Sequence, residues 1–301
     1  MKRRQFINQT VASTAFITAT GVSLSACGTT RKKHITILHT NDVHSHIDPF
    51  PPTHSRNPNQ GGVARRATLI ESIRKENPHT LLLDAGDIFQ GTPYFNFYGG
   101  EIEFKLMSML KYDAATLGNH DFDNGVDGLY TQLPNASFEI LNANYDFSNT
   151  IMDGHAKPYT IFIKDGVKIG VFGLGVELNG LVNKTLYKET KYLDPVEKAQ
   201  DITRVLKEEK QCDLVICLSH LGYKYQDDKV SDIVLARNTQ NIDLIIGGHT
   251  HTFMDKPVVE TNKQGKKVLI NQVGCYGIYL GRIDFYLDNT TANSNGISIS
   301  V

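Results

Sequence analysis

Short apolar runs rich in Val, Ile and Leu recur along this chain from Ile35 onward, separated by amphipathic stretches and by turns rich in Gly and Asn. This alternation predicts a layered α/β or α+β domain, because strands and helices must bury their apolar faces against one another. The predicted strands are residues 35–38, 80–83, 114–117, 167–172, 214–218 and 244–246. The sequence contains no internal repeats.

The clearest predicted helix follows Asp194 and Pro195, because apolar residues then recur at helical spacing on one face. Asp194 is expected to cap this helix, and Pro195 to occupy its first turn. In the C-terminal third, strands with antiparallel pairing are predicted at residues 258–259, 268–270 and 283–287. Residues 48–59 are predicted to form a Pro-rich loop, and residues 289–301 a polar tail without enough apolar content to pack.

The first 26 residues are predicted to be an export signal, because Lys2, Arg3 and Arg4 precede an uncharged stretch of apolar and small residues. The Arg pair resembles the twin-arginine signal, whose route carries folded proteins. Residues 24–27 resemble the bacterial lipobox, which predicts lipidation of Cys27 and an anchor and linker over residues 27–34. An ordinary cleaved signal is the alternative. A membrane span is not expected, because about 20 strongly apolar residues are needed.

The remaining residues suit one large domain, predicted at residues 35–288. A formal net charge of -1 gives no general attraction to nucleic acid polymers, so an anionic substrate needs local positive charge, which a metal would supply. Cys212, Cys217 and Cys275 have no paired spacing and predict no disulfide framework. Cys217 lies in an apolar run and is expected to be buried.

Residues of metal-binding type form five clusters, each directly after a predicted strand, where α/β folds build their sites. The clusters are Asn41-Asp42-Val43-His44, Gly86-Asp87, Gly118-Asn119-His120-Asp121, Ser219-His220 and Gly247-Gly248-His249-Thr250-His251. Taken singly, each cluster is also compatible with an ordinary polar turn. Together, their order and spacing favour a shared metal site.

This arrangement resembles the calcineurin-like metallophosphoesterases and, within them, the 5′-nucleotidase group. The similar runs are residues 37–42, 84–87, 90–93, 118–123 and 247–251, and the resemblance extends from about residue 35 to residue 288. It implies a four-layer αββα sandwich, in which two mixed β-sheets lie face to face between helices and the metal site lies on loops at the strand ends.

The resemblance also implies the ligands of two divalent ions, which Mn, Zn, Fe or Co would suit because the donors are mixed oxygen and nitrogen. It assigns Asp42, His44 and His251 to one ion, Asn119, His220 and His249 to the other, and Asp87 to both. The implied reaction is in-line attack on phosphorus by a hydroxide held between the ions. His120 would stabilise the transition state or protonate the leaving group, with Asp123 orienting it; a His without a proton role is the alternative.

The implied function is hydrolysis of a small phosphomonoester, expected to be a nucleotide, by a 5′-nucleotidase-like enzyme in the cell envelope, either periplasmic or membrane-anchored. The resemblance covers only a catalytic domain and not the C-terminal domain that binds the nucleotide in this group. We therefore expect either a separately encoded specificity partner or unaided hydrolysis of small phosphate esters. The alternatives are a cyclic-nucleotide phosphodiesterase, a sulfur-ester hydrolase on the same scaffold, and an inactive binding lipoprotein.

Other histidines and one aromatic run lie beside these clusters or elsewhere in the chain. His39 and His46 flank the first cluster and are candidates for hydrogen bonding to the metal ligands. The surface or loops are expected to hold His34, His54, His79 and His155. An aromatic run near the second cluster, residues 94–98, is attributed to packing rather than to base stacking.

Overall fold

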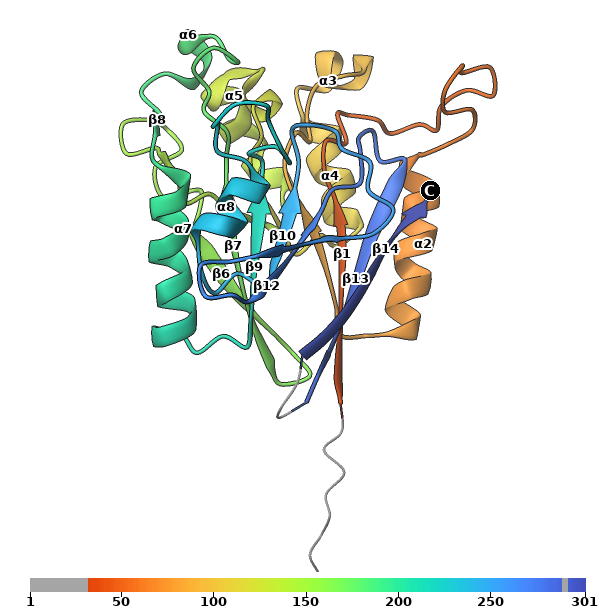
Figure 1. The fold of residues 1–301 in the computed structure, drawn as a ribbon. Helices are drawn as coiled ribbons and strands as arrows, with labels where there is room; N and C mark the ends of the chain where they lie inside the picture. Colours follow the sequence, from red (N-terminus) through yellow and green to blue (C-terminus); the bar gives the residue numbers. More distant parts are fainter. Residues whose placement is uncertain (1–31, 289–291) are drawn as a thin grey trace, which may run out of the picture. The chain divides into compact units, whose positions relative to one another are not determined.

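The computed structural model describes residues 32–288 and 292–301, in which two mixed β-sheets lie face to face with helices on both outer faces (Figure 1). The predicted four-layer sandwich is confirmed. The predicted export signal and the lipidated Cys27 fall within residues 1–31 and lie outside the described residues. In the described part of the chain, no helix is long and apolar enough to cross a membrane.

The first sheet has the strand order β14-β13-β1-β2-β3-β4 in the described residues. Its strands are β1 (Lys33–Thr40), β2 (Thr80–Asp84), β3 (Ala114–Ala115), β4 (Glu139–Ile140), β13 (Tyr279–Leu287) and β14 (Ala292–Ser300). Strand β1 pairs in parallel with β2 and antiparallel with β13, so that Ile37 lies between Leu81 and Ile283. The carboxyl ends of β1 and β2 therefore meet at one edge of the sheet.

The second sheet has the order β11-β12-β10-β9-β7-β6, again for the described residues. Its strands are β6 (Tyr159–Lys164), β7 (Val167–Leu174), β9 (Leu214–Ser219), β10 (Leu244–Gly247), β11 (Val258–Thr261) and β12 (Lys267–Asn271). Strand β9 pairs in parallel with both β7 and β10. A separate two-stranded ladder joins β5 (Tyr145–Asp146) to β8 (Lys191–Tyr192).

Helices cover both outer faces of the sheets and surround the loops at the carboxyl ends of the central strands (Figure 1). They are α2 (Val63–Glu76), α3 (Pro93–Tyr98), α4 (Glu101–Met109), α5 (Gly125–Gln132), α6 (Lys184–Tyr187), α7 (Pro195–Arg204) and α8 (Asp232–Asn238). A 3₁₀ turn at His120–Phe122 precedes α5, a second at Leu133–Asn135 follows it, and a π-helical turn at Val205–Glu209 extends α7.

The apolar residues of each strand divide between an inner and an outer layer, as the alternation of side chains along a strand requires. Ile37 packs with Ile216 in the cluster between the two sheets. The neighbouring residue Leu38 packs on the other side of β1, in the cluster that contains Ile70 of α2 and Phe104 of α4. The inner layer thus fixes the two sheets against each other, and the outer layers attach the helices.

The predicted α7 helix is confirmed in its position and in its cap. Asp194 Oδ1 accepts hydrogen bonds from the amides of Val196 and Glu197 at 2.8 and 2.9 Å, which satisfies two donors that a helix start leaves free. Cys217 is buried as predicted and packs in the outer layer that contains Ala199 of α7. The antiparallel pairing predicted for the C-terminal third holds for β11 with β12 and for β13 with β1.

The sequence predicts a polar tail over residues 289–301 that does not pack, and for residues 292–300 this prediction is wrong. Ala292–Ser300 forms β14, which pairs antiparallel with β13 along its whole length, from Ala292 opposite Leu287 to Ser300 opposite Tyr279. An edge strand needs only backbone hydrogen bonds to its neighbour and tolerates polar side chains. For this reason, the low apolar content of the segment was a poor guide to its structure.

Candidate metal centre

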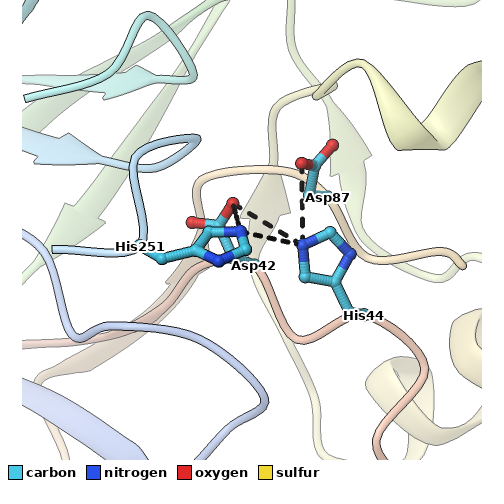
Figure 2. Close-up of side chains that lie close together, drawn as sticks. All are labelled: Asp42, His44, Asp87 and His251. Atoms are coloured by element: carbon cyan, nitrogen blue, oxygen red, sulfur yellow. Dashed lines mark hydrogen bonds and ion pairs between the residues drawn. The ribbon is translucent and has the colours of Figure 1, made fainter. Parts of the chain in front are cut away.

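Four side chains from three separate loops converge at the carboxyl ends of the strands (Figure 2). Asp42 and His44 follow β1, Asp87 follows β2, and His251 follows β10. Asp42 Oδ1 lies 3.3 Å from His251 Nε2 and 4.0 Å from His44 Nε2, and Asp87 Oδ2 lies 3.8 Å from His44 Nε2. Each residue offers one ligand atom within 4.8 Å of the others, so the group can hold one cation.

A second group shares Asp87 with the first and adds His220 from the end of β9 and His249 from the end of β10. His220 Nε2 lies 3.0 Å from Asp87 Oδ2 without the geometry of a hydrogen bond. His220 Nδ1 is paired with the Ala85 carbonyl oxygen at 2.7 Å, which leaves Nε2 as the atom that faces the site. One carboxylate thus lies between two clusters of donors, as a dinuclear site requires.

The loop after β3 places Asn119 and His120 beside this shared carboxylate. The His120 amide donates a hydrogen bond to Asp87 Oδ1 at 2.8 Å, and the His120 ring lies edge-on to the His44 ring with centroids 5.2 Å apart. Asn119 is buried, and its Oδ1 has no hydrogen-bond partner among the described residues. A buried amide oxygen without a donor is costly, and coordination of a cation would satisfy it.

The turns that carry these donors have an unusual backbone. Asp42, His44, Asp87, His249 and His251 all have φ between 49° and 73°, in the left-handed region that side chains other than glycine seldom adopt. Close packing adds a second constraint on the turn after β3, because a Cβ on Gly118 would lie 2.2 Å from Asp87 Oδ1. Any side chain at residue 118 would therefore displace the shared carboxylate.

Asp121 holds two of these turns together, and sequence reasoning gave it no role. Its Oδ1 accepts hydrogen bonds from the amides of Ile88 and Phe89, and its Oδ2 from those of Asp87 and Gly118, at 2.8–3.1 Å. Burial raises the pKa of Asp121 to about 7, as does the charge of Asp87, although these hydrogen bonds oppose the shift. Its place in the Gly118–Asp123 run was the only sequence signal for it.

The sequence also gave no indication of a role for Gln272, which fixes the turn after β10. Its Nε2 donates to the Gly248 carbonyl oxygen at 2.8 Å and to Asp232 Oδ2 at 3.2 Å. Its Oε1 accepts from the Thr252 amide at 3.0 Å. The side chain thus links the turn that carries His249 and His251 to buried Asp232, which comes from α8. No sequence spacing connects Gln272 with these partners.

The electrostatics of the site fit bound cations. Burial alone would lower the pKa of His220, but the negative charges of Asp87 and Asp42 outweigh it and raise that pKa to about 10. The pKa of His251 also rises to about 10, chiefly through its hydrogen bond to Asp42. In both places a positive charge is favoured next to a buried carboxylate, and metal ions compete with protons for such donors. The donor set is therefore suited to divalent cations.

The remaining predicted residues are placed as follows. His120 Nδ1 lies 2.7 Å from Asp123 Oδ2, and this hydrogen bond raises the pKa of His120. His46 Nδ1 is paired with the carbonyl oxygen of His44 at 2.9 Å, so it contacts a candidate ligand through the backbone. His39 instead lies buried in the sheet, where Asn271 Nδ2 donates to its Nε2 at 2.9 Å, and no described ligand residue contacts it through a hydrogen bond.

Comparison with known proteins identifies the class to which this fold and this site belong. The model of the calcineurin-like phosphoesterase family matches residues 35–253, more than half of the chain. The chain therefore belongs to the calcineurin-like phosphoesterase family.

Similar proteins are found among nucleotide phosphoesterases. The trifunctional nucleotide phosphoesterase YfkN of Bacillus subtilis is 35% identical over 286 residues, which cover 84% of this chain and 18% of that protein. A snake venom 5′-nucleotidase of Crotalus adamanteus is 36% identical over 276 residues, which cover 85% of this chain and 45% of that protein. The solved structure of a 5′-nucleotidase precursor from Thermus thermophilus has a TM-score of 0.79 at 32% identity. The match covers 89% of this chain and 55% of that protein. The chain spans about half the length of these relatives or less.

Metal binding is expected to stabilise the folded protein. The donors converge only in the fold, so each ion at about 100 times its Kd should add about 2.7 kcal/mol, which corresponds to a rise of roughly 5–10 °C per ion in the midpoint of thermal unfolding. The measurement is thermal unfolding of chelator-treated protein with and without Mn²⁺. The matched control is Asp87→Asn, which removes the shared carboxylate charge and should lose most of the shift. Equal midpoints of the wild-type protein with and without metal would contradict the assignment.

Proposed function

We propose that this chain is a dinuclear-metal phosphoester hydrolase that acts on phosphomonoesters, with 5′-nucleotides as the preferred class. The observation that carries this proposal is the pair of donor groups that share Asp87. The nucleotide phosphoesterase names of the relatives support the substrate class. Because the chain spans only part of those relatives, its own activity and substrate remain part of the proposal.

In this proposal, Asp42, His44 and His251 would hold one divalent ion and His220, His249 and Asn119 would hold the other, and Asp87 would contribute to both sites. Ions bound there would supply positive charge for the phosphoryl oxygens and would make a bound water more acidic. The chain supplies the fixed geometry. Asp121 and Gln272 hold the ligand turns in place before the substrate arrives, so little reorganisation is needed during the reaction.

His120 and Asp123 are proposed to act on the leaving oxygen. The contact between His120 Nδ1 and Asp123 Oδ2 at 2.7 Å leaves Nε2 available for the substrate, and the ring lies against His44 at the site. The His120 side chain is 38% exposed, so an incoming ester is able to reach it. From this position Nε2 would donate a hydrogen bond to the leaving oxygen and transfer its proton as the bond to phosphorus breaks.

The substrate class is tested with the purified protein alone, loaded with Mn²⁺ and assayed against AMP, a generic aryl phosphate and a cyclic nucleotide. We expect hydrolysis of both monoesters and little activity on the cyclic diester. Strong selectivity for AMP without any added protein would exclude the need for a separately encoded specificity partner. If no monoester is hydrolysed by protein that has bound two ions, the proposed function is wrong.

The role of His120 predicts a specific kinetic pattern. His120→Asn is expected to lower kcat for AMP by about 10²–10⁴-fold, the typical contribution of a positioned proton donor, while bound metal stays at the wild-type level. Asp123→Asn should have a smaller effect in the same direction, because it removes only the orienting charge. The loss in His120→Asn should shrink for an aryl phosphate, whose leaving group needs no proton. An equal loss for both substrates would argue against proton donation.

We also propose that the protein is exported to the cell envelope and tethered to a membrane through lipid on Cys27, on the basis of the twin-arginine and lipobox-like runs. Growth with a radioactive fatty acid should label the wild-type protein but not Cys27→Ser, and the variant should leave the membrane fraction. A wild-type protein that is unlabelled and soluble would refute the anchor.

A further inference from the structure

A small cavity with both apolar and polar lining residues lies behind the first donor group, between the 42–45 turn and helices α2 and α4. It has a volume of about 20 Å³, and its polar lining includes Ser45, Arg66, Asp84, Glu103 and Tyr112. All five residues are at most 5% exposed. Arg66 Nε and Nη1 and Glu103 Oε2 have no hydrogen-bond partner among the described residues.

Unpartnered charged atoms at this depth are expensive, whether they belong to a guanidinium or a carboxylate. The cavity exceeds the roughly 10–15 Å³ that one water needs, and the three atoms provide the two to four polar partners that hold a buried water. A single water between Arg66 and Glu103 would therefore satisfy both side chains and couple their charges.

Glu103 also reaches the metal-binding turn directly. Ser45 Oγ donates a hydrogen bond to Glu103 Oε1 at 2.5 Å, and the Ser45 amide donates to the Ile88 carbonyl oxygen at 2.9 Å. Ser45 has φ of 58°, and the preceding residue, His44, has φ of 51°. Two adjacent residues in the left-handed region are strained, so the turn that presents His44 needs outside contacts to keep its shape.

Arg66 and Asp84 also line the cavity and contact the neighbouring turns. Asp84 Oδ1 accepts a hydrogen bond from the Gly86 amide at 2.9 Å, one residue before Asp87. Arg66 Nη1 lies against the Gly277 backbone, where a Cβ would be only 2.0 Å away, and the adjacent Tyr276 amide donates to the Asp42 carbonyl oxygen at 2.7 Å. The cavity thus lies behind the turns that carry Asp42, His44 and Asp87.

We propose that Glu103 is a positioning residue for the metal centre, which holds the His44 turn through Ser45 while one buried water links its second oxygen to Arg66. The inference rests on the proposed metal centre. It assigns to α4 a role in metal affinity, although no residue of α4 offers a ligand atom in either donor group.

The test measures metal affinity without substrate, by calorimetric titration of Mn²⁺ into chelator-treated protein. Glu103→Gln is expected to lower the affinity for one of the two ions by about 10–100-fold, the usual effect of removing a group that orients a ligand. The affinity for the other ion should change by less than about threefold. The matched control is Glu101→Gln on the same helix, whose partner is the exposed Lys105 and whose affinities should equal those of the wild type.

Ser45→Gly provides a second variant in case Glu103→Gln does not fold. Glycine adopts a positive φ without strain, so this change removes the hydroxyl contact but allows the same backbone. It should weaken binding of the same ion. The loss in the double variant should be smaller than the product of the two single losses, because Ser45 and Glu103 share one hydrogen bond. Effects that multiply in the double variant would overturn the proposal.

The outcomes distinguish a failure of the proposed metal centre from a failure of the positioning role of Glu103. If the wild-type protein binds no Mn²⁺, both the proposed metal centre and the positioning role of Glu103 are wrong. Wild-type protein that binds two ions, with unchanged affinities in a folded Glu103→Gln or Ser45→Gly variant, would overturn only the positioning role. Equal weakening of both ions in a folded variant would also overturn it, because that result indicates a general loss of structure.

Discussion

Two carboxylates, Asp42 and Asp87, are buried at the carboxyl edge of the sheets, and the arrangement of the site depends on compensating their charge. Neither has a Lys or Arg ion-pair partner among the described residues; their close partners are the imidazoles of His44, His220 and His251. Burial of an uncompensated carboxylate is unfavourable. Without a metal, the protonated imidazoles of His220 and His251 offset this cost, and divalent cations would offset it more completely at the same positions. Metal binding and the stability of this edge are thus two aspects of one electrostatic requirement.

The sandwich makes such a site possible because parallel pairing brings separate chain segments to one edge. β1 and β2 end together in one sheet, and β9 and β10 end together in the other, so loops distant in sequence converge. The apolar inner layer fixes the two sheets against each other. The turns themselves are strained, and they keep their shape because backbone contacts cross between them, such as those from the Asp42 amide to Gly86 and from the His44 amide to Asp87.

The convergence of the candidate donors could be predicted because donor residues stand in short local runs. A His or Asp directly after an apolar strand is visible without knowledge of the fold, and resemblance to a family supplied the proposed roles. Contacts between distant segments were not visible. Hydrogen bonds to the backbone or to one hydroxyl give Asp121, Gln272 and Glu103 their roles. No periodic pattern in the sequence indicates such partners. Strand β14 was missed for a related reason, since its pairing with β13 depends on backbone groups that every sequence shares.

The polar residues behind the metal-binding turns explain why this architecture needs charged groups in its interior. An apolar layer under the His44 turn would pack well, but it would not direct a left-handed backbone, because apolar contacts have little directionality. Hydrogen bonds from Ser45 to Glu103 and from Gly86 to Asp84 specify both distance and orientation. Burial raises the pKa of Asp84 to about 7, whereas its hydrogen bonds and the positive charge of Arg66 favour the ionised form. The site is therefore shaped by a buried polar layer that itself requires the surrounding apolar sandwich to exclude water.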